Sequence, residues 1–491
     1  MLSVAVAACT PTPEQSAPRA PNVLWVVWDT VRADRLQVYG YDKPTTPHLV
    51  RWAADARVFT DCQSTANSTV PSTAAMFTGL LPDRHGMSHD YRWLDDGHTT
   101  TAERFKEAGY ATFLWASNPH LASDANFTQG FDVEHHPWDR LHRSHASNIV
   151  REKVRNDRAT TIGRSGGASH LRPWHLSASG RLAQPTLAAW LDGLGDDRPW
   201  FAFVNLMEAH QPYIPPRKYR ARMMDEAAVQ RSYRQNRGPA AWWGFVFGFF
   251  DYSEYDLDVL GGTYDATLAE LDDLFHGLVQ ELDRRGLADD TVVVLTADHG
   301  EHLGEHHLLD HQYALYQPVL HVPLVVRAPG RIEPGVDARP VMNFDLHPTL
   351  LELAGLAPAA GTIDALSLLR PDVERERISM HPATFPVPFR HARQHDPDFD
   401  LTPFRRRFEA LRRGELKLIR SSLGERELFD LAADPAETED LSTVDRSRTR
   451  EIDARLTSWR NERPRRERER ESAPTLSEQQ RRRLRALGYA E

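Results

Sequence analysis

Two unbroken, mostly apolar runs, each ending at an acidic residue, are the features that most constrain how this chain can fold. They cover residues 23–28 before Asp29 and residues 292–297 before Asp298. Strands buried on both faces have this pattern, which is typical of parallel sheets covered by helices. Ligands of open α/β sheets bind beyond the carboxyl ends of the strands. The sequence therefore predicts an α/β fold with both acids at one functional edge of the sheet.

A hydroxyl-rich segment between these runs predicts the start of a helix. Residues 67–73 read Asn-Ser-Thr-Val-Pro-Ser-Thr, and Thr78-Gly79 ends the apolar stretch that follows. Pro71 suits a first helical turn, and Gly79 suits a helix end. Thr69 is therefore predicted just before a helix N-terminus, where free N–H groups and the dipole favour an anion. An ordinary capped helix is the alternative, because hydroxyl caps are common.

These segments together predict a metal site. Asp29, Asp298, His299 and the hydroxyl oxygen of Thr69 form a mixed oxygen and nitrogen set that could hold one divalent ion. A divalent ion activates a hydroxyl for nucleophilic attack. The pattern therefore favours an enzyme in which Thr69 attacks an anionic ester.

Composition limits the class of protein. With 491 residues, 41% hydrophobic and 26% charged, the chain has the composition of a soluble globular protein, and its length favours one large and one small domain. Its net charge of −10 argues against a nucleic-acid partner, which would require a basic surface.

Apolar patterns also predict the remaining organisation of the chain. Further strands are expected at 57–62, 111–116, 200–206 and 321–326, helices at 47–56, 100–109, 258–285 and 343–355, and a C-terminal hairpin at 408–419. The insertion at about 140–190 contains a basic, histidine-rich part for which no regular structure is predicted, and its histidines are expected to be solvated. An insertion at 218–256 carries an aromatic block, for which core or subunit packing is favoured over an acceptor pocket.

The N-terminus resembles a bacterial lipoprotein signal. Val6-Ala7-Ala8-Cys9 resembles a lipobox, and a tether rich in Pro, Ser and Thr follows up to residue 21. This predicts a lipid anchor at Cys9 as the membrane attachment, and a place in the bacterial cell envelope, facing the periplasm or the exterior. A disordered leader is the alternative. Cys62 then has no partner, so no disulfide framework is expected.

Several ordered motifs resemble the sulfatase family of the alkaline phosphatase superfamily, from residue 21 to residue 491. They are the segments 22–41, 45–49, 69–86 and 298–306. The resemblance implies a mostly parallel central sheet flanked by helices, with a smaller C-terminal α+β subdomain. The expected division is 1–21 signal and tether, 22–370 catalytic domain, 376–460 subdomain, and 461–491 charged linker and terminal helix.

The family resemblance also suggests three further site residues. His210, after the strand at 200–206, would contact the leaving-group oxygen, and His311 would face the anionic oxygens of the substrate. Asn118 follows the strand at 111–116 and would contact the substrate, although a lone Asn in a turn is more often structural. The implied substrate is an anionic ester, either a small molecule or linked to a glycan or lipid.

Departures from the family pattern change the expected chemistry. Family members convert a Cys or Ser to formylglycine, but Thr69 occupies that position and Thr73 stands where an arginine is usual. Threonine cannot form this aldehyde, because its β-carbon carries a methyl group, so no formylglycine is expected. Thr30 replaces a second acid and His299 replaces an asparagine. Mn²⁺ or Zn²⁺ is therefore favoured over Ca²⁺ or Mg²⁺, which are also possible.

Three functions are consistent with these features. The favoured one is a metal-dependent hydrolase or transferase that cleaves phosphate esters through a covalent Thr69 intermediate, because an Asp–His pair resembles phosphonate monoester hydrolases. The second is a sulfuric ester hydrolase that works without formylglycine. The third is a non-catalytic envelope lipoprotein that binds a ligand, and the complete set of Asp29, Thr69, Asp298 and His299 argues against it.

Overall fold

The computed structural model describes residues 20–463, apart from 89, 156–172, 196–197, 236–237, 358–362, 371–374 and 383–386. The predicted anchor at Cys9, its tether and the terminal helix predicted after residue 477 lie outside the described residues. Within the described part, no helix combines the length and apolar character needed to cross a membrane.

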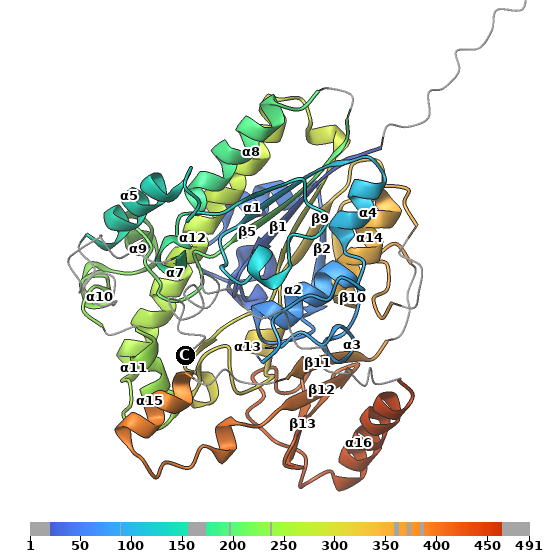
Figure 1. The fold of residues 1–491 in the computed structure, drawn as a ribbon. Helices are drawn as coiled ribbons and strands as arrows, with labels where there is room; N and C mark the ends of the chain where they lie inside the picture. The colour runs from blue at the N-terminus through green and yellow to red at the C-terminus, as the bar shows by residue number, and fades with distance from the viewer. Residues whose placement is uncertain are drawn as a thin grey trace, which may run out of the picture.

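The central sheet has eight strands and is mostly parallel, as the family resemblance implied (Figure 1). In spatial order the strands are β10 (Gly335–Met342), β2 (Arg57–Gln63), β9 (Leu324–Arg327), β6 (Thr291–Ala297), β1 (Asn22–Trp28), β5 (Trp200–Leu206), β3 (Ala111–Ala116) and β4 (Val133–His135). Only β9 runs antiparallel to its neighbours among these strands. The expected strand at 321–326 is this β9, which begins three residues later than predicted.

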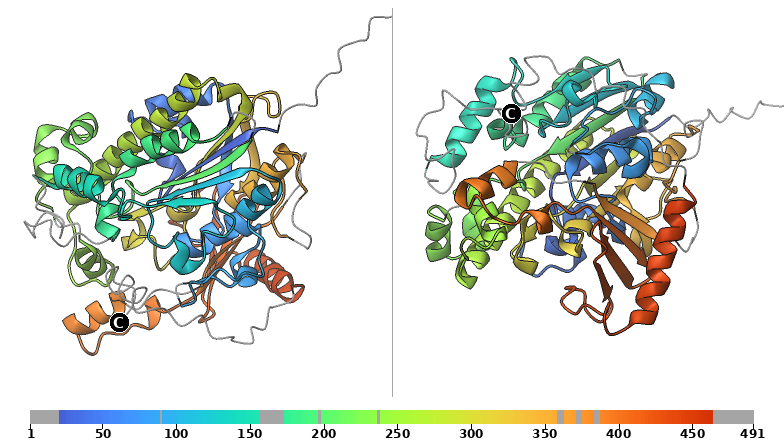
Figure 2. Two further views of the ribbon diagram at one scale, coloured as in Figure 1. Left: turned by 45° about the horizontal axis from the view of Figure 1, so that its top comes forward. Right: turned by 60° about the horizontal axis from the view of Figure 1, so that its bottom comes forward.

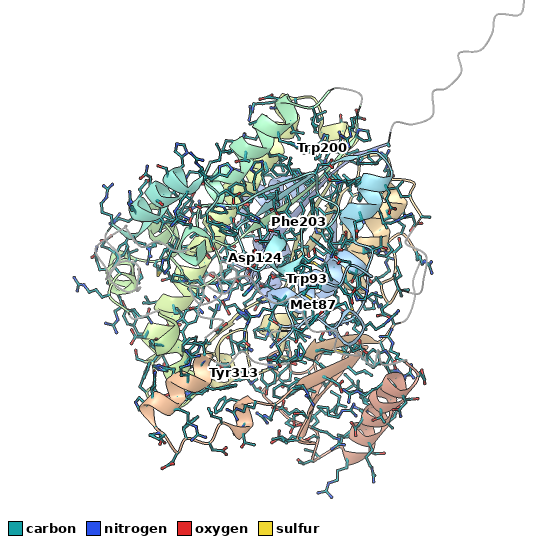
Figure 3. All side chains as sticks on the ribbon, in the orientation of Figure 1. Met87, Trp93, Asp124, Trp200, Phe203 and Tyr313 are labelled. Atoms are coloured by element: carbon teal, nitrogen blue, oxygen red, sulfur yellow. The ribbon has the colours of Figure 1, made fainter. Side chains whose placement is uncertain are left out.

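Strand β1 explains why the N-terminal run is continuously apolar. Its alternate side chains face opposite sides of the sheet, and both sides are covered. The Trp28 ring contacts Phe275 of α12 (Glu254–Arg284) at 6.0 Å, while Trp25 contacts Phe77 of α2 (Thr69–Thr78) at 5.9 Å. Phe203 of the neighbouring strand packs against the same two rings, Trp25 and Phe77, in the interior (Figure 3).

Helices complete the two outer layers. In Figure 1, α8 (Ala183–Asp192) and α12 lie on one side of the sheet. On the other side lie α2, α4 (Thr101–Glu107) and α14 (Leu346–Leu353). Strands β1 and β6 pair in parallel with Trp28 opposite Ala297, so their carboxyl ends lie side by side.

A smaller antiparallel sheet forms the C-terminal subdomain. Its strands are β11 (Arg377–His381), β12 (Phe408–Arg413), β13 (Leu416–Ser421) and β14 (Arg426–Asp430), and α16 (Arg446–Asn461) packs against them (Figure 2). The predicted hairpin is thus confirmed. This sheet also touches the segment before Thr69, because the Met380 N–H donates to the Thr65 carbonyl at 2.9 Å.

The 140–190 insertion is more regular than the sequence predicted. It contains α5 (Arg143–Val154), α7 (Pro173–Leu176) and α8. His142 is buried with its ring 5.2 Å from Trp115, so the prediction that the histidines here are solvated is wrong for this residue. Helix α5 buries Ala146, Ile149, Val150 and Lys153. These positions have helical spacing, but a lysine occupies one of them, and this hides the apolar pattern.

The 218–256 insertion folds into α9 (Arg217–Met223), α10 (Glu226–Ser232) and α11 (Pro239–Val246). Most of its aromatic block belongs to the core, as favoured from the sequence, although Phe250 is 43% exposed. Trp242 is 1% exposed and packs on Tyr213 at 5.2 Å between ring centroids.

A buried charge cluster attaches α5 to the rest of the molecule. Lys153 Nζ lies 2.8 Å from Glu270 Oε1 of α12 and 3.6 Å from Glu208 Oε1, just after β5. Two carboxylates thus share one ammonium group away from water. Burial raises the pKa of Glu270 to about 7, and the Glu208 carboxylate adds to the increase, while Lys153 opposes it.

We expect Glu270→Gln to flatten the pH dependence of stability. The folded chain keeps the Glu270 proton until about pH 7, whereas an unfolded glutamate releases it near its ordinary pKa of about 4.3. Stability therefore falls as the pH rises through this interval, because the unfolded state binds fewer protons. The variant should reduce the loss of unfolding free energy between pH 5 and pH 7.5 by about 1–3 kcal/mol, measured by chemical denaturation.

Asp283→Asn is the matched control, because Asp283 is exposed on the same helix. It should leave the pH dependence of unfolding unchanged. An identical slope in Glu270→Gln and in the unmodified chain would contradict the assignment of this proton to Glu270.

Candidate active site

The nucleophile segment lies where the sequence placed it, with one difference. Helix α2 starts at Thr69 itself, and Ser68 is its N-cap residue. Thr69 is 5% exposed. Its Oγ1 lies 3.3 Å from His299 Nε2 and accepts a hydrogen bond from Asn118 Nδ2 at 3.2 Å. The hydroxyl is therefore held at a helix N-terminus, where backbone N–H groups favour negative charge.

Three of the four predicted metal ligands converge beside this hydroxyl. Ligand atoms of Asp29, Asp298 and His299 all lie within 4.8 Å of one another, and all three residues are fully buried. Asp29 Oδ1 and Asp298 Oδ2 have no hydrogen-bond partner among the described residues. A cation would stabilise two buried carboxylate oxygens in this position. The donor set therefore fits the divalent ion predicted from the sequence.

The Asp298 carboxylate is fixed by its surroundings. Its Oδ1 accepts the N–H of Thr30 at 3.2 Å and of His299 at 2.9 Å. Its backbone carbonyl accepts hydrogen bonds from Ser72 Oγ at 2.7 Å and from Asn343 Nδ2 at 3.0 Å. Burial raises the Asp298 pKa well above its ordinary value, and repulsion from Asp29 adds to the increase. A bound cation would relieve both effects.

His299 presents a lone pair to the site. Its Nδ1 lies 2.9 Å from the Gly300 carbonyl oxygen, which can only accept, so Nδ1 carries the hydrogen and Nε2 is the acceptor. Burial lowers the His299 pKa well below its ordinary value, and His311 contributes. A neutral imidazole with an available Nε2 is a suitable ligand for Mn²⁺ or Zn²⁺.

Thr30 does not replace the missing carboxylate. Its Oγ1 donates to the Asp29 carbonyl oxygen at 2.7 Å, and its contact with Asp298 is through the backbone N–H. Its φ of 61° turns the chain sharply directly after the ligand Asp29. This turn lies where the family motif has a second acid, so the group holds one carboxylate fewer than that motif.

His311 lies next to this group and is paired with two carboxylates. Its Nδ1 is 2.8 Å from Asp310 Oδ1 and 3.3 Å from Glu301 Oε1, and its ring centroid is 4.4 Å from that of His299. Burial by itself lowers the His311 pKa, but the two carboxylates raise it well above the ordinary value. Positive charge at this point suits the predicted contact with an anionic substrate.

Two other groups of acids and histidines lie in the described residues, and each makes ion pairs or hydrogen bonds within the protein, although Glu301 Oε2 is buried without a hydrogen-bond partner among the described residues. Asp310 and Glu301 pair with His311. Asp272 accepts the N–H groups of His48 and Leu49 at 2.8 Å each, at the start of α1 (Pro47–Ala53). The group at Asp29, Asp298 and His299 is therefore the candidate metal centre.

His210 follows β5 and lies beside His311. Its Nδ1 is 2.8 Å from the Gln211 carbonyl oxygen, so Nδ1 carries the hydrogen and Nε2 has a lone pair. The ring centroids of His210 and His311 are 5.4 Å apart. Burial lowers the His210 pKa, although Asp29 opposes this change. Its predicted contact with the leaving group stays a prediction.

Asn118 is a positioning residue in this structure. Its Nδ2 donates to Asp29 Oδ2 at 2.8 Å as well as to Thr69 Oγ1, so one amide holds the predicted metal ligand and the predicted nucleophile together. Asn205, which the sequence analysis missed, accepts the Asn118 N–H at 2.9 Å and donates to Asp29 Oδ2 at 3.3 Å. The sequence could have indicated Asn205 as a site residue, because it is a polar residue near the end of a buried strand.

His120 was also missed. It is 5% exposed, and its N–H donates to Asn118 Oδ1 at 2.9 Å. Burial lowers its pKa well below the ordinary value, with contributions from Arg92, His210 and His311. His120 therefore lies near His210 and His311 at the edge of the candidate site.

The fold and this site together define a hydrolase of ester bonds in the alkaline phosphatase superfamily. The chain belongs to the sulfatase family, because the family model described as Sulfatase matches residues 21–356. A second model, described as the C-terminal part of N-sulphoglucosamine sulphohydrolase, matches residues 304–463.

Curated relatives and solved structures agree with this placement. The chain is 25% identical to an ulvan-active sulfatase of Formosa agariphila, over 90% of this chain and 81% of that protein. It is 24% identical to a choline-sulfatase of Rhizobium meliloti, over 86% and 82% of the two chains. The fold is similar to that of a phosphonate monoester hydrolase of Agrobacterium radiobacter, with a TM-score of 0.69, 20% identity, and coverage of 90% and 96%.

Proposed function

We propose that this chain hydrolyses, or transfers groups from, phosphate esters by direct attack of the Thr69 hydroxyl. The observation that carries this proposal is the position of Thr69 Oγ1 at the start of α2, 3.3 Å from His299 Nε2 and bonded to Asn118, beside three buried metal-type ligands. A nucleophile held next to its activating group is the usual arrangement for covalent catalysis.

Asp29, Asp298 and His299 would hold one divalent ion, for which Mn²⁺ or Zn²⁺ is favoured. When bound, such an ion supplies Lewis acidity, which lowers the pKa of a nearby hydroxyl and offsets the charge of the ester. This cation would offset the repulsion between the carboxylates of Asp29 and Asp298.

The protein's own groups account for the covalent steps. Thr69 Oγ1 forms a bond to phosphorus as the bond from phosphorus to the leaving oxygen breaks. The Thr69 hydroxyl gives its proton to solvent water, and the leaving alkoxide takes up a proton from solvent water to depart as the alcohol. Cationic His311 and the N–H groups at the start of α2 stabilise the charge on the other oxygens. Water, or an acceptor alcohol, then displaces Thr69 from phosphorus, and His210 Nε2 can accept a proton.

The chemistry of a threonine nucleophile is the reason for preferring a phosphate ester over a sulfate ester as the substrate. Without an aldehyde hydrate, the covalent ester cannot be released by collapse of a geminal diol, so water must attack the central atom of the ester itself. Sulfate ester hydrolysis is the second candidate, because the curated relatives, an ulvan-active sulfatase and a choline-sulfatase among them, are named as sulfatases.

Paired aryl esters test the choice. We expect the metal-loaded enzyme to hydrolyse p-nitrophenyl phosphate or bis(p-nitrophenyl) phosphate with a kcat/KM at least about tenfold above that for p-nitrophenyl sulfate. A preference for the sulfate would establish the second candidate. Absence of turnover with all three substrates would contradict the assignment of an ester hydrolase.

A further inference from the structure

The amide of Asn343 is fully buried and contacts the backbone of the candidate site. Asn343 opens the short helical turn Asn343–Asp345, which follows β10. Its Nδ2 donates to the carbonyl oxygens of Ala297 at 3.2 Å and of Asp298 at 3.0 Å. Because an amide nitrogen carries two hydrogens, one is available for each carbonyl. Asn343 is therefore attached to the end of β6, which carries Asp298 and His299.

A hydroxyl group from the nucleophile helix contacts the same carbonyl. Ser72, three residues after Thr69 on α2, donates its Oγ hydrogen to the Asp298 carbonyl oxygen at 2.7 Å. Asn343 Nδ2 lies 3.2 Å from Ser72 Oγ, and both side chains are fully buried. Ser64 Oγ lies 2.5 Å from the same carbonyl oxygen. One carbonyl thus joins the helix that begins at Thr69 to the strand end that carries the predicted metal ligands.

The turn that carries Asn343 is itself fixed by a buried carboxylate. Asp345 is 1% exposed, and it pairs with Arg375. Its carboxylate oxygens accept the N–H of Met342 at 2.9 Å and of Leu366 at 2.9 Å. The backbone of this turn is therefore held in place, and a side chain on a fixed turn can hold other groups in position.

The distance between the predicted nucleophile and His299 depends on these contacts. Thr69 Oγ1 lies 3.3 Å from His299 Nε2, and the two residues belong to different parts of the fold. His299 follows Asp298 directly, and Thr69 begins the helix that carries Ser72. A shift of the Asp298 backbone relative to α2 would therefore change this distance. A displacement of about 1 Å can lower an enzymatic rate about 100-fold.

We propose that Asn343 and Ser72 are positioning residues for the proposed reaction. Asn343 fixes the strand end that holds the predicted metal ligands Asp298 and His299, and Ser72 fixes α2, and with it Thr69, against that strand end. Loss of Asn343 should therefore weaken metal binding, whereas loss of Ser72 should misplace the nucleophile and leave metal binding intact. The inference rests on the proposed function, because it concerns the alignment of its nucleophile with its metal ligands.

Metal binding and backbone exchange test the role of Asn343. Mn²⁺ is titrated calorimetrically into the metal-free full chain and into its Asn343→Ala variant. We expect the variant to bind Mn²⁺ about 10-fold more weakly, at the lower end of the cost of losing a group that supports a metal ligand. Hydrogen–deuterium exchange of the peptide 296–301 should increase, because the strand end loses its anchor. Unchanged exchange, or an unchanged affinity, would overturn the role of Asn343.

Turnover tests the role of Ser72. Ser72→Ala should lower kcat for the preferred p-nitrophenyl ester about 10- to 100-fold, with KM and the Mn²⁺ affinity within about twofold of the unmodified enzyme. Ser72→Cys, which has a similar size and a weak S–H donor, should recover part of kcat. A kcat unchanged by Ser72→Ala would overturn this role. A phosphoryl-sized adduct on Ser72 would overturn it too, since Ser72 would then be the nucleophile.

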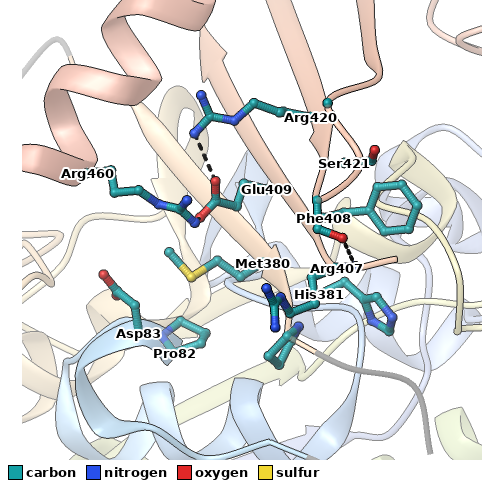
Figure 4. A pocket seen from close by; sticks show the side chains of 13 residues that line it. Pro82, Asp83, Met380, His381, Arg407, Phe408, Glu409, Arg420, Ser421 and Arg460 are labelled. Carbon is teal, nitrogen blue, oxygen red and sulfur yellow. Dashed lines mark hydrogen bonds and ion pairs between the residues drawn. The ribbon is translucent and has the colours of Figure 1, made fainter. Parts of the chain in front are cut away.

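Glu409→Gln is the matched control for a general loss of polar contacts. It weakens the ion pairs of Glu409 with Arg420 and Arg460 in the small sheet, beside a cavity whose lining residues do not belong to the candidate site (Figure 4). This control should leave kcat, Mn²⁺ affinity and the exchange of 296–301 unchanged. If all three variants behaved alike, the roles of Asn343 and Ser72 would be only structural. Exchange needs neither metal nor substrate, so its outcome separates failure of this inference from failure of the proposed function.

Discussion

Replacing Thr69 with alanine should abolish ester turnover while leaving the fold and the metal content in place. The loss should be about 10³-fold or more, because attack and its activation are removed together and such effects are not additive. Asp29, Asp298 and His299 keep their positions, since none of them depends on the threonine methyl or hydroxyl for its backbone hydrogen bonds. Steady-state kinetics and elemental analysis of the same preparation make the measurement.

Thr69→Ser is the matched control for the nucleophile. It keeps the oxygen, loses one methyl group, and should retain measurable activity. Mass spectrometry of the unmodified enzyme quenched during turnover should show a phosphoryl-sized adduct on the peptide that contains Thr69. Ser68 is the strongest competitor, because its hydroxyl is buried without a hydrogen-bond partner among the described residues. An adduct on Ser68, or near-normal rates in Thr69→Ala, would show that the nucleophile is a different hydroxyl.

Asp298→Ala should remove the metal and the activity together. The purified enzyme should hold about one divalent ion per chain. In the other two groups of acids and histidines, Asp310 is paired with His311 and Asp272 accepts hydrogen bonds from the start of α1. Loss of a ligand should weaken binding by more than the roughly 10–100-fold cost of losing an outer-shell partner. Elemental analysis after dialysis gives the stoichiometry, and kinetics with added Mn²⁺ or Zn²⁺ gives the activity.

Two variants separate metal loss from misfolding. Asp298→Asn keeps an oxygen that can accept the N–H groups of Thr30 and His299, so it should fold while still losing affinity for the ion. Asp272→Asn alters the α12 acid that accepts hydrogen bonds from the start of α1, and it should leave the metal content unchanged. Two ions per active chain, or full metal content in Asp298→Ala, would contradict this assignment.

The grouping of the candidate site residues was largely predictable because these residues follow strong local signals. Asp29 and Asp298 end runs that must be buried on both faces, and parallel strands bring their carboxyl ends to one edge. Thr69 precedes a proline and an apolar helix that ends at Gly79. These patterns need no knowledge of distant contacts, so the sequence is sufficient to predict them.

Contacts between distant segments were not predictable in the same way. Asn205 acts through Asn118 and Asp29, each more than 80 positions away, and nothing next to Asn205 in the sequence indicates this pairing. Helix α5 was missed because Lys153 takes an apolar position, and its two glutamate partners come from the segment after β5 and from α12. Buried charges are satisfied by tertiary structure, which an apolar pattern does not record.

The side chain of Asn67 has a consequence for how such an enzyme can be altered. The Asn67 amide, two residues before Thr69, forms hydrogen bonds both to the loop after His311 and to the last residue of β11. The C-terminal subdomain therefore contacts the segment that leads into Thr69. A chimera that takes this subdomain from another member of the family must keep a hydrogen-bond donor at position 381. Without it, the hydrogen bond to Asn67 that aligns the subdomain with the segment before Thr69 is lost.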